Sequence, residues 1–244
     1  MIFKIARSPK GGQVTHYDEY EVSVTKGMTI LDVLFIIQDD VDPSLSFRYS
    51  CRGAVCGSCA MLIDREPRLA CRTQALTIKQ SSLNLKAFPA IENKQTGQAQ
   101  NPMVLIEPLP NMRVLKDLLV DMTPFHQSFE SMKLWVDPTE GNTPRTQTPE
   151  ELSRYERYVN CISCGICHGS CPVSSYHHEY IGPAPLAKAW RFYEDSRVTN
   201  RERYLEAAKQ SNGAPMCELV MNCVKSCPKD VAPGGAIRRI KDTG

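Results

Sequence analysis

The residues of this 244-residue chain whose type and spacing could do chemistry are its 11 cysteines. They fall into three groups: Cys51, Cys56, Cys59 and Cys71; then Cys161, Cys164, Cys167 and Cys171; then Cys217, Cys223 and Cys227. An odd number of cysteines argues against a complete set of disulfides, and the thiolate is a good ligand for iron and zinc. Zinc usually takes paired cysteines, two or four ligands at a time, which these groups do not match. The grouping therefore favours iron–sulfur centres over zinc sites or scattered buried thiols.

The first group has the spacing C-x4-C-x2-C-x11-C, which is typical of plant-type ferredoxins with a 2Fe–2S cluster. The short loop "CRGAVCGSC" brings three thiolates to one side of such a cluster. Gly53 and Gly57 could adopt φ > 0 there and let backbone N–H groups approach the sulfurs, although an ordinary turn would also use glycine. The predicted ligands of the 2Fe–2S cluster are Cys51, Cys56, Cys59 and Cys71.

The second group reads C-x2-C-x2-C-x3-C-P, the run found in bacterial ferredoxins. In two-cluster ferredoxins the fourth cysteine of this run binds the other cluster. The first three cysteines would then share a 4Fe–4S cluster with the last cysteine of the third group. The predicted ligands of this cluster are Cys161, Cys164, Cys167 and Cys227.

The third group repeats the second with one change, because Val220 stands where the second group has Cys164. An isopropyl group has no lone pair, so this corner of a cubane would hold its iron weakly. The sequence therefore predicts a 3Fe–4S cluster. Its predicted ligands are Cys171, Cys217 and Cys223. The alternative is a 4Fe–4S cluster whose fourth iron carries water, hydroxide or a carboxylate such as Glu218.

Before residue 109 the pattern indicates strands and one helix around the first cysteine loop. Strands are expected in "IFKIA", "YEVSVT", "LSFRYS" and "SLNLKAF", because apolar and polar residues alternate there. Thr29 is a candidate N-cap, with Asp32 three positions later. The segment "AMLIDREPRLAC" predicts a hairpin that turns at residues 64–67. Together these elements predict a plant-type ferredoxin β-grasp domain over residues 1–109.

After residue 109 the pattern indicates helices. Leu115, Leu118, Leu119 and Met122 keep helical spacing, and Pro149 followed by two glutamates suits a helix N-terminus. The polar tract over residues 90–102 resembles an exposed loop or linker. We therefore expect an α+β protein whose second domain, residues 110–244, is all-helical and similar to bacterial ferredoxins.

The composition and the absence of several motifs exclude some classes of function for this chain. The net charge of +2 gives no strong field for nucleic acid, and no run of about 18 apolar residues could span a membrane. The N-terminal residues do not look like a secretion signal. The nucleotide motif G-x-G-x-x-G and the hydrolase motifs G-x-S-x-G and H-E-x-x-H do not occur. Three inorganic centres without an organic substrate site indicate a protein that relays single electrons and holds no catalytic residue of its own.

Nearly the whole chain resembles the iron–sulfur subunit of succinate dehydrogenase and fumarate reductase, the succinate:quinone oxidoreductase family. The resemblance rests on "SCRGAVCGSCAMLIDREPRLAC", "CISCGICHGSCP", "YIGPAPLAKAWRFYEDSR" and "CELVMNCVKSCPKDV". It implies a flavoprotein partner with covalent FAD near the 2Fe–2S cluster. It also implies a quinone and a membrane-anchor partner, often with haem b, near the 3Fe–4S cluster. The expected location is peripheral, on the cytoplasmic face of the bacterial inner membrane.

The resemblance also implies contacts with the quinone. The positions that match the family's quinone pocket are Pro172, Tyr176, Val220 and Lys241. Lys241 could instead be an ordinary helix-end cation. Some members have histidine where this chain has Glu218, so the resemblance does not carry that histidine's role over to this position. Histidines 168, 177 and 178 could relay protons, or could simply be exposed or hydrogen-bonded.

Two other hypotheses stay open at this point. A soluble ferredoxin would carry electrons to transient partners, whereas the aromatic and proline residues of "SSYHHEYIGPAPLAKAW" suit a permanent interface. A subunit of another flavin oxidoreductase, such as a thiol-linked fumarate reductase, would have a different electron donor. Neither the direction of the reaction nor the kind of quinone follows from this chain.

Overall fold

The computed structural model describes residues 1–78, 103–136 and 146–243. The chain folds as two compact units, Met1–Asp121 with Cys164–Ser170 (unit 1) and Met122–Ser163 with Cys171–Gly244 (unit 2). A mixed sheet in unit 1 and helices in unit 2 make the protein α+β, as predicted. The predicted strand at 82–88 and the polar tract at 90–102 lie outside the described residues.

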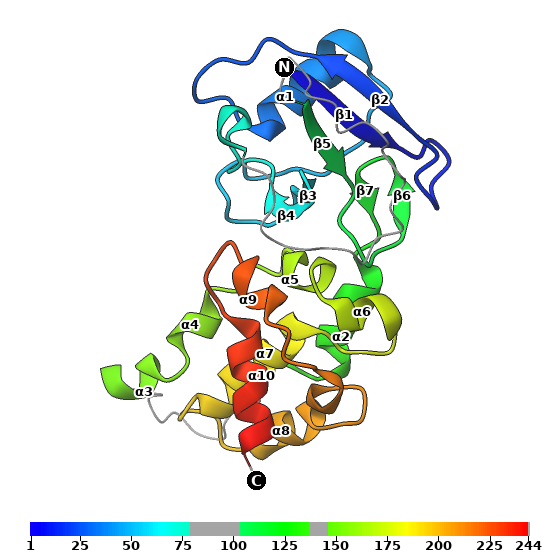
Figure 1. Cartoon of the computed structure of the whole chain (residues 1–244). Coiled ribbons are helices and arrows are strands. Elements are labelled where there is room, and N and C mark those ends of the chain that lie inside the picture. The colour runs from blue at the N-terminus through cyan, green and yellow to red at the C-terminus, as the bar shows by residue number, and fades with distance from the viewer. Residues whose placement is uncertain (79–102, 137–145, 244) are drawn as a thin grey trace. The chain divides into compact units, whose positions relative to one another are not determined.

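Unit 1 is built on a mixed sheet. Its elements are β1 (Ile2–Arg7), β2 (His16–Glu21), α1 (Ile30–Ile36), the π-helix η1 (Ile37–Val41), β3 (Ala60–Ile63), β4 (Glu66–Leu69), the 3₁₀-helix η2 (Ala75–Thr77), β5 (Met103–Glu107), β6 (Val114–Lys116), β7 (Leu119–Val120) and α5 (Ile166–Gly169). Within the described residues, five strands form the sheet in the order β2-β1-β5-β3-β4 (Figure 1). The β1 and β5 strands run parallel, with Ile5 opposite Ile106, and the other neighbours are antiparallel.

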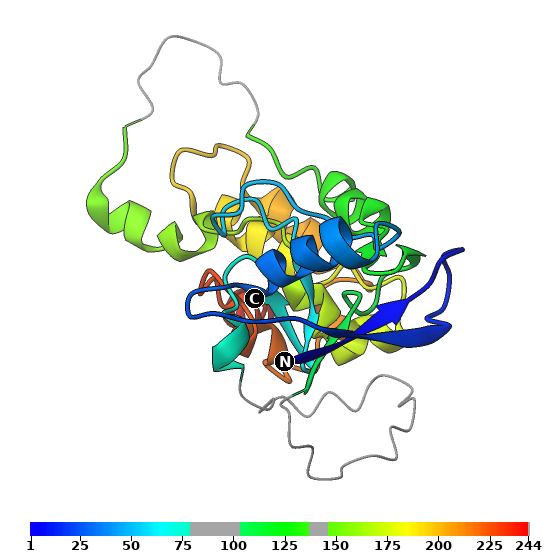
Figure 2. The same cartoon turned by 90° about the horizontal axis from the view of Figure 1, so that it is seen from above.

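The predicted helix after Thr29 is present as α1. Thr29 caps it in both directions: the Thr29 hydroxyl accepts from the Asp32 backbone N–H at 3.2 Å, and the Asp32 carboxylate accepts from the Thr29 N–H at 2.8 Å. The α1 helix buries Val33 and Leu34 and lies beside the sheet in both views (Figure 2). This apolar face, together with Phe3 and Ile5 of β1, supplies the core of unit 1.

The predicted hairpin at residues 60–71 is also present. Its two-residue turn is Asp64–Arg65, both with positive φ, so the turn is shorter than the four residues expected. The spacing of Leu115, Leu118 and Leu119 did not produce a helix; β6 and β7 form an antiparallel hairpin there. The expected strand at 45–50 is not formed either. Residues 110–121 belong to the same compact unit as the sheet. The division into two domains at residue 109 stays a prediction.

Unit 2 is helical. Its elements are α2 (Thr123–Ser131), α3 (Pro149–Ser153), α4 (Glu156–Val159), α6 (Pro172–Tyr176), α7 (Pro183–Glu194), α8 (Glu202–Ala208), the 3₁₀-helix η3 (Ala214–Met216), α9 (Asn222–Lys225) and α10 (Pro233–Asp242). Helix α7 packs against α10, α8 and α4 and buries Leu186 and Trp190. Pro149 stands at the start of α3, as expected, after the N-cap Thr148. In the described part of the chain, every helix is too short or too polar to cross a bilayer.

Candidate iron–sulfur centres

The first cysteine loop points backbone N–H groups at the sulfur of Cys51. Gly53, Val55 and Cys56 donate to Cys51 Sγ at 3.4, 3.3 and 3.2 Å. The loop achieves this with positive φ at Arg52, Ala54 and Gly57. The prediction of φ > 0 is therefore right for Gly57 and wrong for Gly53, because the residues on either side of Gly53 take that conformation. Converging N–H groups form a cradle suited to anionic sulfur.

The other three cysteines of this group also take part in hydrogen bonds between backbone N–H groups and sulfur. Cys56 Sγ accepts from the backbone of Cys51 at 3.4 Å and of Ser58 at 3.5 Å, and Cys59 Sγ accepts from Cys71 N at 3.5 Å. Burial acts against the Cys56 thiolate, but hydrogen bonds from Ser58 and Cys51 outweigh it and lower the pKa of Cys56 to about 6. Burial raises the pKa of Cys59 to about 12. The donor set thus fits a cluster of thiolate-ligated irons.

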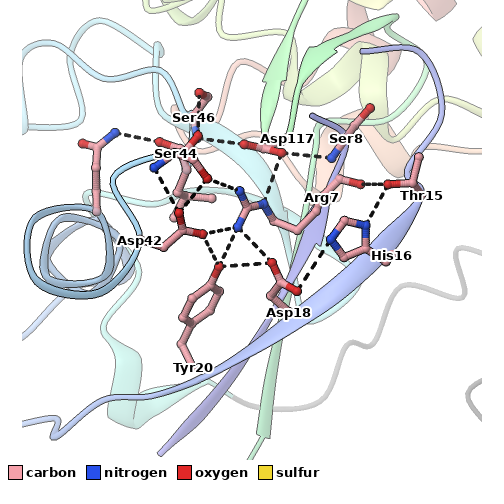
Figure 3. Close-up of polar contacts among 12 residues, drawn as sticks. Arg7, Ser8, Thr15, His16, Asp18, Tyr20, Asp42, Ser44, Ser46 and Asp117 are labelled. Atoms are coloured by element: carbon pink, nitrogen blue, oxygen red, sulfur yellow. Dashed lines mark hydrogen bonds and ion pairs between the residues drawn. The ribbon is translucent and has the colours of Figure 1, made fainter. Parts of the chain in front are cut away.

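A buried arginine network supports the segment that leads into this loop (Figure 3). Arg7 at the end of β1 donates to Asp18 at 3.0 Å and to Asp117 at 3.2 Å, and it also pairs with Asp42. It further donates to the Tyr20 and Ser44 hydroxyls at 2.6 and 2.8 Å. The network therefore joins β1 and β2 to the segment after η1 and to the turn between β6 and β7.

Asp117, whose exposed fraction is 0%, extends this network towards the cysteines. Its carboxylate accepts from the backbone N–H of Ser8 at 2.9 Å and of Ser46 at 3.1 Å. The hairpin then holds the next residues: Leu118 N donates to Ser46 O at 3.1 Å, and Arg48 donates to Val120 O at 2.7 Å. The β6–β7 hairpin is thus the brace of the cysteine loop.

An aromatic cluster lies beside the cysteine loop in unit 1. Phe35 packs edge-on against Phe47 at 5.5 Å and against Tyr49 at 4.6 Å between ring centroids. The guanidinium of Arg52 lies 4.7 Å from the Phe35 ring centroid. Cys51 is exposed, and Val55 at the tip of the loop has an exposed fraction of 64%. The loop therefore presents apolar groups to solvent next to a predicted ligand.

The three cysteines predicted to bind the 3Fe–4S cluster meet in one pocket of unit 2. The pocket is lined by Cys171, Pro172, Val173, Tyr180, Pro183, Cys217, Glu218, Leu219, Val220, Met221, Asn222 and Cys223. Cys171 and Cys223 are buried, and Cys217 is half-buried. Sequence separation alone did not require these residues to line one pocket, and the ligand exchange between the two motifs stays a prediction.

The local backbone suits a bound anionic group at this pocket. Leu219 and Met221, on either side of Val220, have positive φ, and Leu219 N donates to Cys217 Sγ at 3.4 Å. Gly234 at the start of α10 approaches closely, because a Cβ there would lie 2.5 Å from Met221 Sδ and 3.5 Å from Cys223 Sγ. Burial raises the pKa of Cys223 to about 12, and this rise is larger than the lowering that the hydrogen bond from Gly234 N–H produces.

Two hydroxyl groups near this pocket were not singled out from the sequence. The Ser174 and Tyr180 hydroxyls are buried without a hydrogen-bond partner in the described structure. Ser174 is in α6, and its backbone N–H lowers the pKa of Cys171, which burial raises overall. Tyr180 belongs to the "YIGPAP" segment. No spacing rule marks either residue; only burial without a partner does.

The four cysteines predicted to bind the 4Fe–4S cluster are divided between the two units. Cys164 and Cys167 belong to unit 1, and Cys161 and Cys227 belong to unit 2. Cys227 Sγ accepts from Val231 N at 3.4 Å, and Cys167 is buried in α5. This ligand set therefore stays a prediction.

Among the described residues, no three His, Cys, Asp or Glu side chains converge as ligands of a single metal ion do. A cluster is a different kind of site, because it distributes its thiolates over several irons.

The residues assigned to the quinone differ in their surroundings. Pro172 and Val220 line the three-cysteine pocket, and Val220 has an exposed fraction of 47%. Tyr176, at the end of α6, does not line it and has an exposed fraction of 75%. Lys241 Nζ donates to Cys217 O at 2.6 Å, so its ammonium helps to hold the backbone of a predicted ligand.

The three histidines considered as proton carriers are placed as follows. His168 Nε2 lies 3.3 Å from Asn111 O, and burial lowers the pKa of His168. His177 and Glu179 form an exposed ion pair at 3.4 Å when His177 is protonated, and His178 is exposed.

Two family descriptions match the chain. Residues 2–127 match the family described as a 2Fe–2S iron–sulfur cluster binding domain, and residues 158–231 match the family described as a 4Fe–4S dicluster domain. The first match covers the sheet of unit 1 and continues into α2, and the second covers the two later cysteine groups.

Curated relatives are similar over nearly the whole chain. The fumarate reductase iron–sulfur subunit of Escherichia coli O157:H7 is 33% identical over 96% of this chain and 88% of its own length. That of Mycobacterium tuberculosis is 35% identical over 93% and 85%. A chain of the Mycobacterium smegmatis Sdh1 complex has the same fold, with a TM-score of 0.82 and 22% identity over 99% of this chain and 93% of that chain.

Proposed function

Because this chain belongs to the family of fumarate reductase iron–sulfur subunits, we propose that it passes electrons between a flavoprotein subunit and a quinone at a membrane anchor. The flavoprotein would carry covalent FAD and interconvert succinate and fumarate. The anchor would carry haem b. The complex would lie at the cytoplasmic face of the inner membrane.

The observation that carries this proposal is the meeting of Cys171, Cys217 and Cys223 in one pocket beside Val220. Three thiols with a valine at the fourth corner fit a 3Fe–4S cluster, a centre that exchanges one electron and offers no open site to an organic substrate. The half-exposed Val220 and the exposed Tyr176 give this end of unit 2 an apolar surface. Such a surface suits an anchor and a quinone, with Pro172 and Lys241 also near it.

The first cysteine loop supports the other end of the electron path. Cys51 is exposed, and Val55 and Tyr49 next to it are exposed too, so a partner could approach the 2Fe–2S cluster closely. The resemblance to the family assigns the flavoprotein to this loop. The 4Fe–4S cluster, held by Cys161, Cys164, Cys167 and Cys227, would stand between the other two in the relay. On this proposal unit 1 is a ferredoxin-like β-grasp fold and unit 2 is similar to bacterial ferredoxins.

The experiment is anaerobic purification of the native complex, with three measurements on it. Iron analysis should give about nine irons per copy of this chain, and the oxidised sample should show the EPR signal of a three-iron centre. Mass spectrometry should identify a flavoprotein and an anchor. Quinol-dependent fumarate reduction or succinate oxidation should then be measured. A chain that purifies alone with its clusters would favour a soluble carrier, and clusters that thiols but not quinol reduce would favour another flavin oxidoreductase.

A further inference from the structure

The hydroxyl of Tyr180 is a buried donor without an acceptor. Tyr180 has an exposed fraction of 2%, and its hydroxyl has no hydrogen-bond partner in the described structure. The side chain lines the pocket that contains Cys171, Cys217 and Cys223. Burying a hydroxyl without a partner costs free energy, and such groups are rare in native proteins. An acceptor is therefore expected from whatever the pocket binds.

The backbone holds Tyr180 firmly in this position. Tyr180 N donates to His177 O at 3.1 Å, and Ile181 N donates to Asn212 O at 2.9 Å. The next residues, Gly182 and Pro183, begin α7, which is packed against α10. With its main chain held and its side chain buried, the ring can reach solvent only if the residues around it move.

The charges that face the hydroxyl are those of the cysteines. Burial raises the pKa of Tyr180 far above its usual value, and negative charge on Cys217 and then Cys171 raises it further. A tyrosine phenol has one O–H to donate. The cysteines are the groups whose charge acts on this hydroxyl, and a cluster bound to them would bring further sulfur acceptors into the same pocket.

We propose that Tyr180 donates its hydroxyl hydrogen bond to a sulfur of the three-iron centre and thereby raises the reduction potential of that centre. This inference rests on the proposed 3Fe–4S cluster. Reduction adds one electron and no proton, so the sulfurs become more negative and the same hydrogen bond becomes stronger. The bond thus stabilises the reduced state more than the oxidised state. Tyr180 tunes the potential and keeps its own proton.

The test is Tyr180→Phe in the complete complex, with the three-iron EPR signal followed during a redox titration. Losing the bond should lower the midpoint. At the wild-type midpoint, the ratio of reduced to oxidised centre should fall about fivefold to tenfold, and tenfold is about 59 mV for one electron. Iron content should stay unchanged. Electron–nuclear double resonance should lose one exchangeable proton coupled to the centre.

Tyr193→Phe is the matched control. Tyr193 is in α7 of the same unit and its ring packs against Trp190 at 5.2 Å, but it does not line the pocket. The same substitution there should leave the midpoint and the coupled proton unchanged. A Tyr193→Phe midpoint that fell as far as that of Tyr180→Phe would show a general packing effect and overturn the proposal.

A second measurement keeps the Tyr180 hydroxyl and changes only its strength as a donor. Replacing all tyrosines by 3-fluorotyrosine makes each phenol a stronger donor, so the midpoint should rise in the wild type and in Tyr193→Phe but not in Tyr180→Phe. If Tyr180→Phe does not assemble, a fluorinated wild type with an unchanged midpoint overturns the proposal. A wild type without a three-iron signal would instead refute the proposed function. A three-iron signal with the same midpoint in both tyrosine variants refutes this inference alone.

Discussion

The cysteine loop of unit 1 and the three-cysteine pocket of unit 2 place the same kind of side chain, a predicted cysteine ligand, in different surroundings. In the loop, Cys51 is exposed and its sulfur accepts three backbone N–H groups. In the pocket, Cys171 and Cys223 are buried. The loop therefore stabilises an exposed sulfur with backbone N–H groups, whereas the pocket encloses its sulfurs in the fold.

Changing the number of thiolates in the pocket should break this comparison most strongly. Val220→Cys places a thiol at the position of the repeat where the second group has Cys164. Its neighbours Leu219 and Met221, which have positive φ, are left unchanged. We expect about ten irons per chain in place of about nine, loss of the three-iron EPR signal, and a lower midpoint because one more thiolate adds negative charge. Iron analysis, EPR and a redox titration measure these three changes.

Val220→Ala is the control for this substitution. It removes most of the isopropyl group and adds no ligand, so the three-iron signal should remain. Loss of the signal in Val220→Ala would mean that valine packing, and not the missing thiolate, keeps the fourth iron away. An unchanged iron content in Val220→Cys would support the hypothesis that this corner already holds an iron with water or Glu218.

The second prediction removes the brace from the loop. Asp117→Ala leaves the buried Arg7 without one of its carboxylates and leaves the N–H groups of Ser8 and Ser46 unpaired. Breaking a buried pair from one side costs about 3–5 kcal/mol, and Asp18 and Asp42 should keep the loss near about 3 kcal/mol. The 2Fe–2S signal in visible circular dichroism should be lost at lower denaturant concentration, whereas the three-iron EPR signal should persist.

Asp117→Asn distinguishes charge from shape here. The amide keeps one oxygen acceptor, so it should lose less stability than alanine does. Loss of both centres at the same denaturant concentration in Asp117→Ala would show that the loop and the pocket unfold together. The two sites could then not be compared as independent sites.

The network around Arg7 and Asp117 also shows which features could be predicted from the sequence and which could not. The cysteine spacings predicted the three ligand groups, and this assignment stays a prediction; the structure places Cys171, Cys217 and Cys223 in the lining of one pocket. The leucine spacing at 115–122 predicted a helix and was wrong. The hairpin there depends on Asp117 pairing with Arg7, 110 residues away, and on an αL conformation at Asp117 that no periodicity encodes. Tyr180 was missed for the same reason, since an orphaned hydroxyl is visible only in three dimensions.

The third prediction acts on the pocket and leaves the loop intact. In Gly234→Ala the new Cβ would lie 2.5 Å from Met221 Sδ, and Cys223 Sγ is 3.5 Å away. Overpacking of this kind costs about 1–3 kcal/mol, so the three-iron centre should be lost at lower temperature. Gly235→Ala is the matched control on the same helix, because a Cβ there meets nothing within 4 Å. It should be neutral or stabilise α10 by about 0.5–1 kcal/mol. Equal losses in both variants would rule out the close approach as the cause.

The smallest effect is the pH dependence of the loop's support. Hydrogen bonds from Ser44, and then from Tyr20 and Arg7, outweigh burial and hold the pKa of Asp42 well below its usual value. The unfolded carboxyl, with a pKa of about 3.9, therefore binds a proton first as the pH falls. The contribution of Asp42 is fully present above about pH 5 and is lost towards lower pH. Since Asp42 is partly exposed, we expect about 1 kcal/mol at most.

Asp42→Asn measures this contribution. The variant should be less stable than the wild type at pH 7, and the difference in denaturation midpoint should shrink as the pH is lowered below about 4, because the unfolded wild-type carboxyl then takes up a proton. The readout is the midpoint for loss of the 2Fe–2S signal at each pH. A difference that stayed constant with pH would mean that Asp42 acts through hydrogen-bond geometry alone. In that case the charge of the Arg7 network would not be what braces the exposed loop, and the contrast with the buried pocket would rest on the backbone N–H groups.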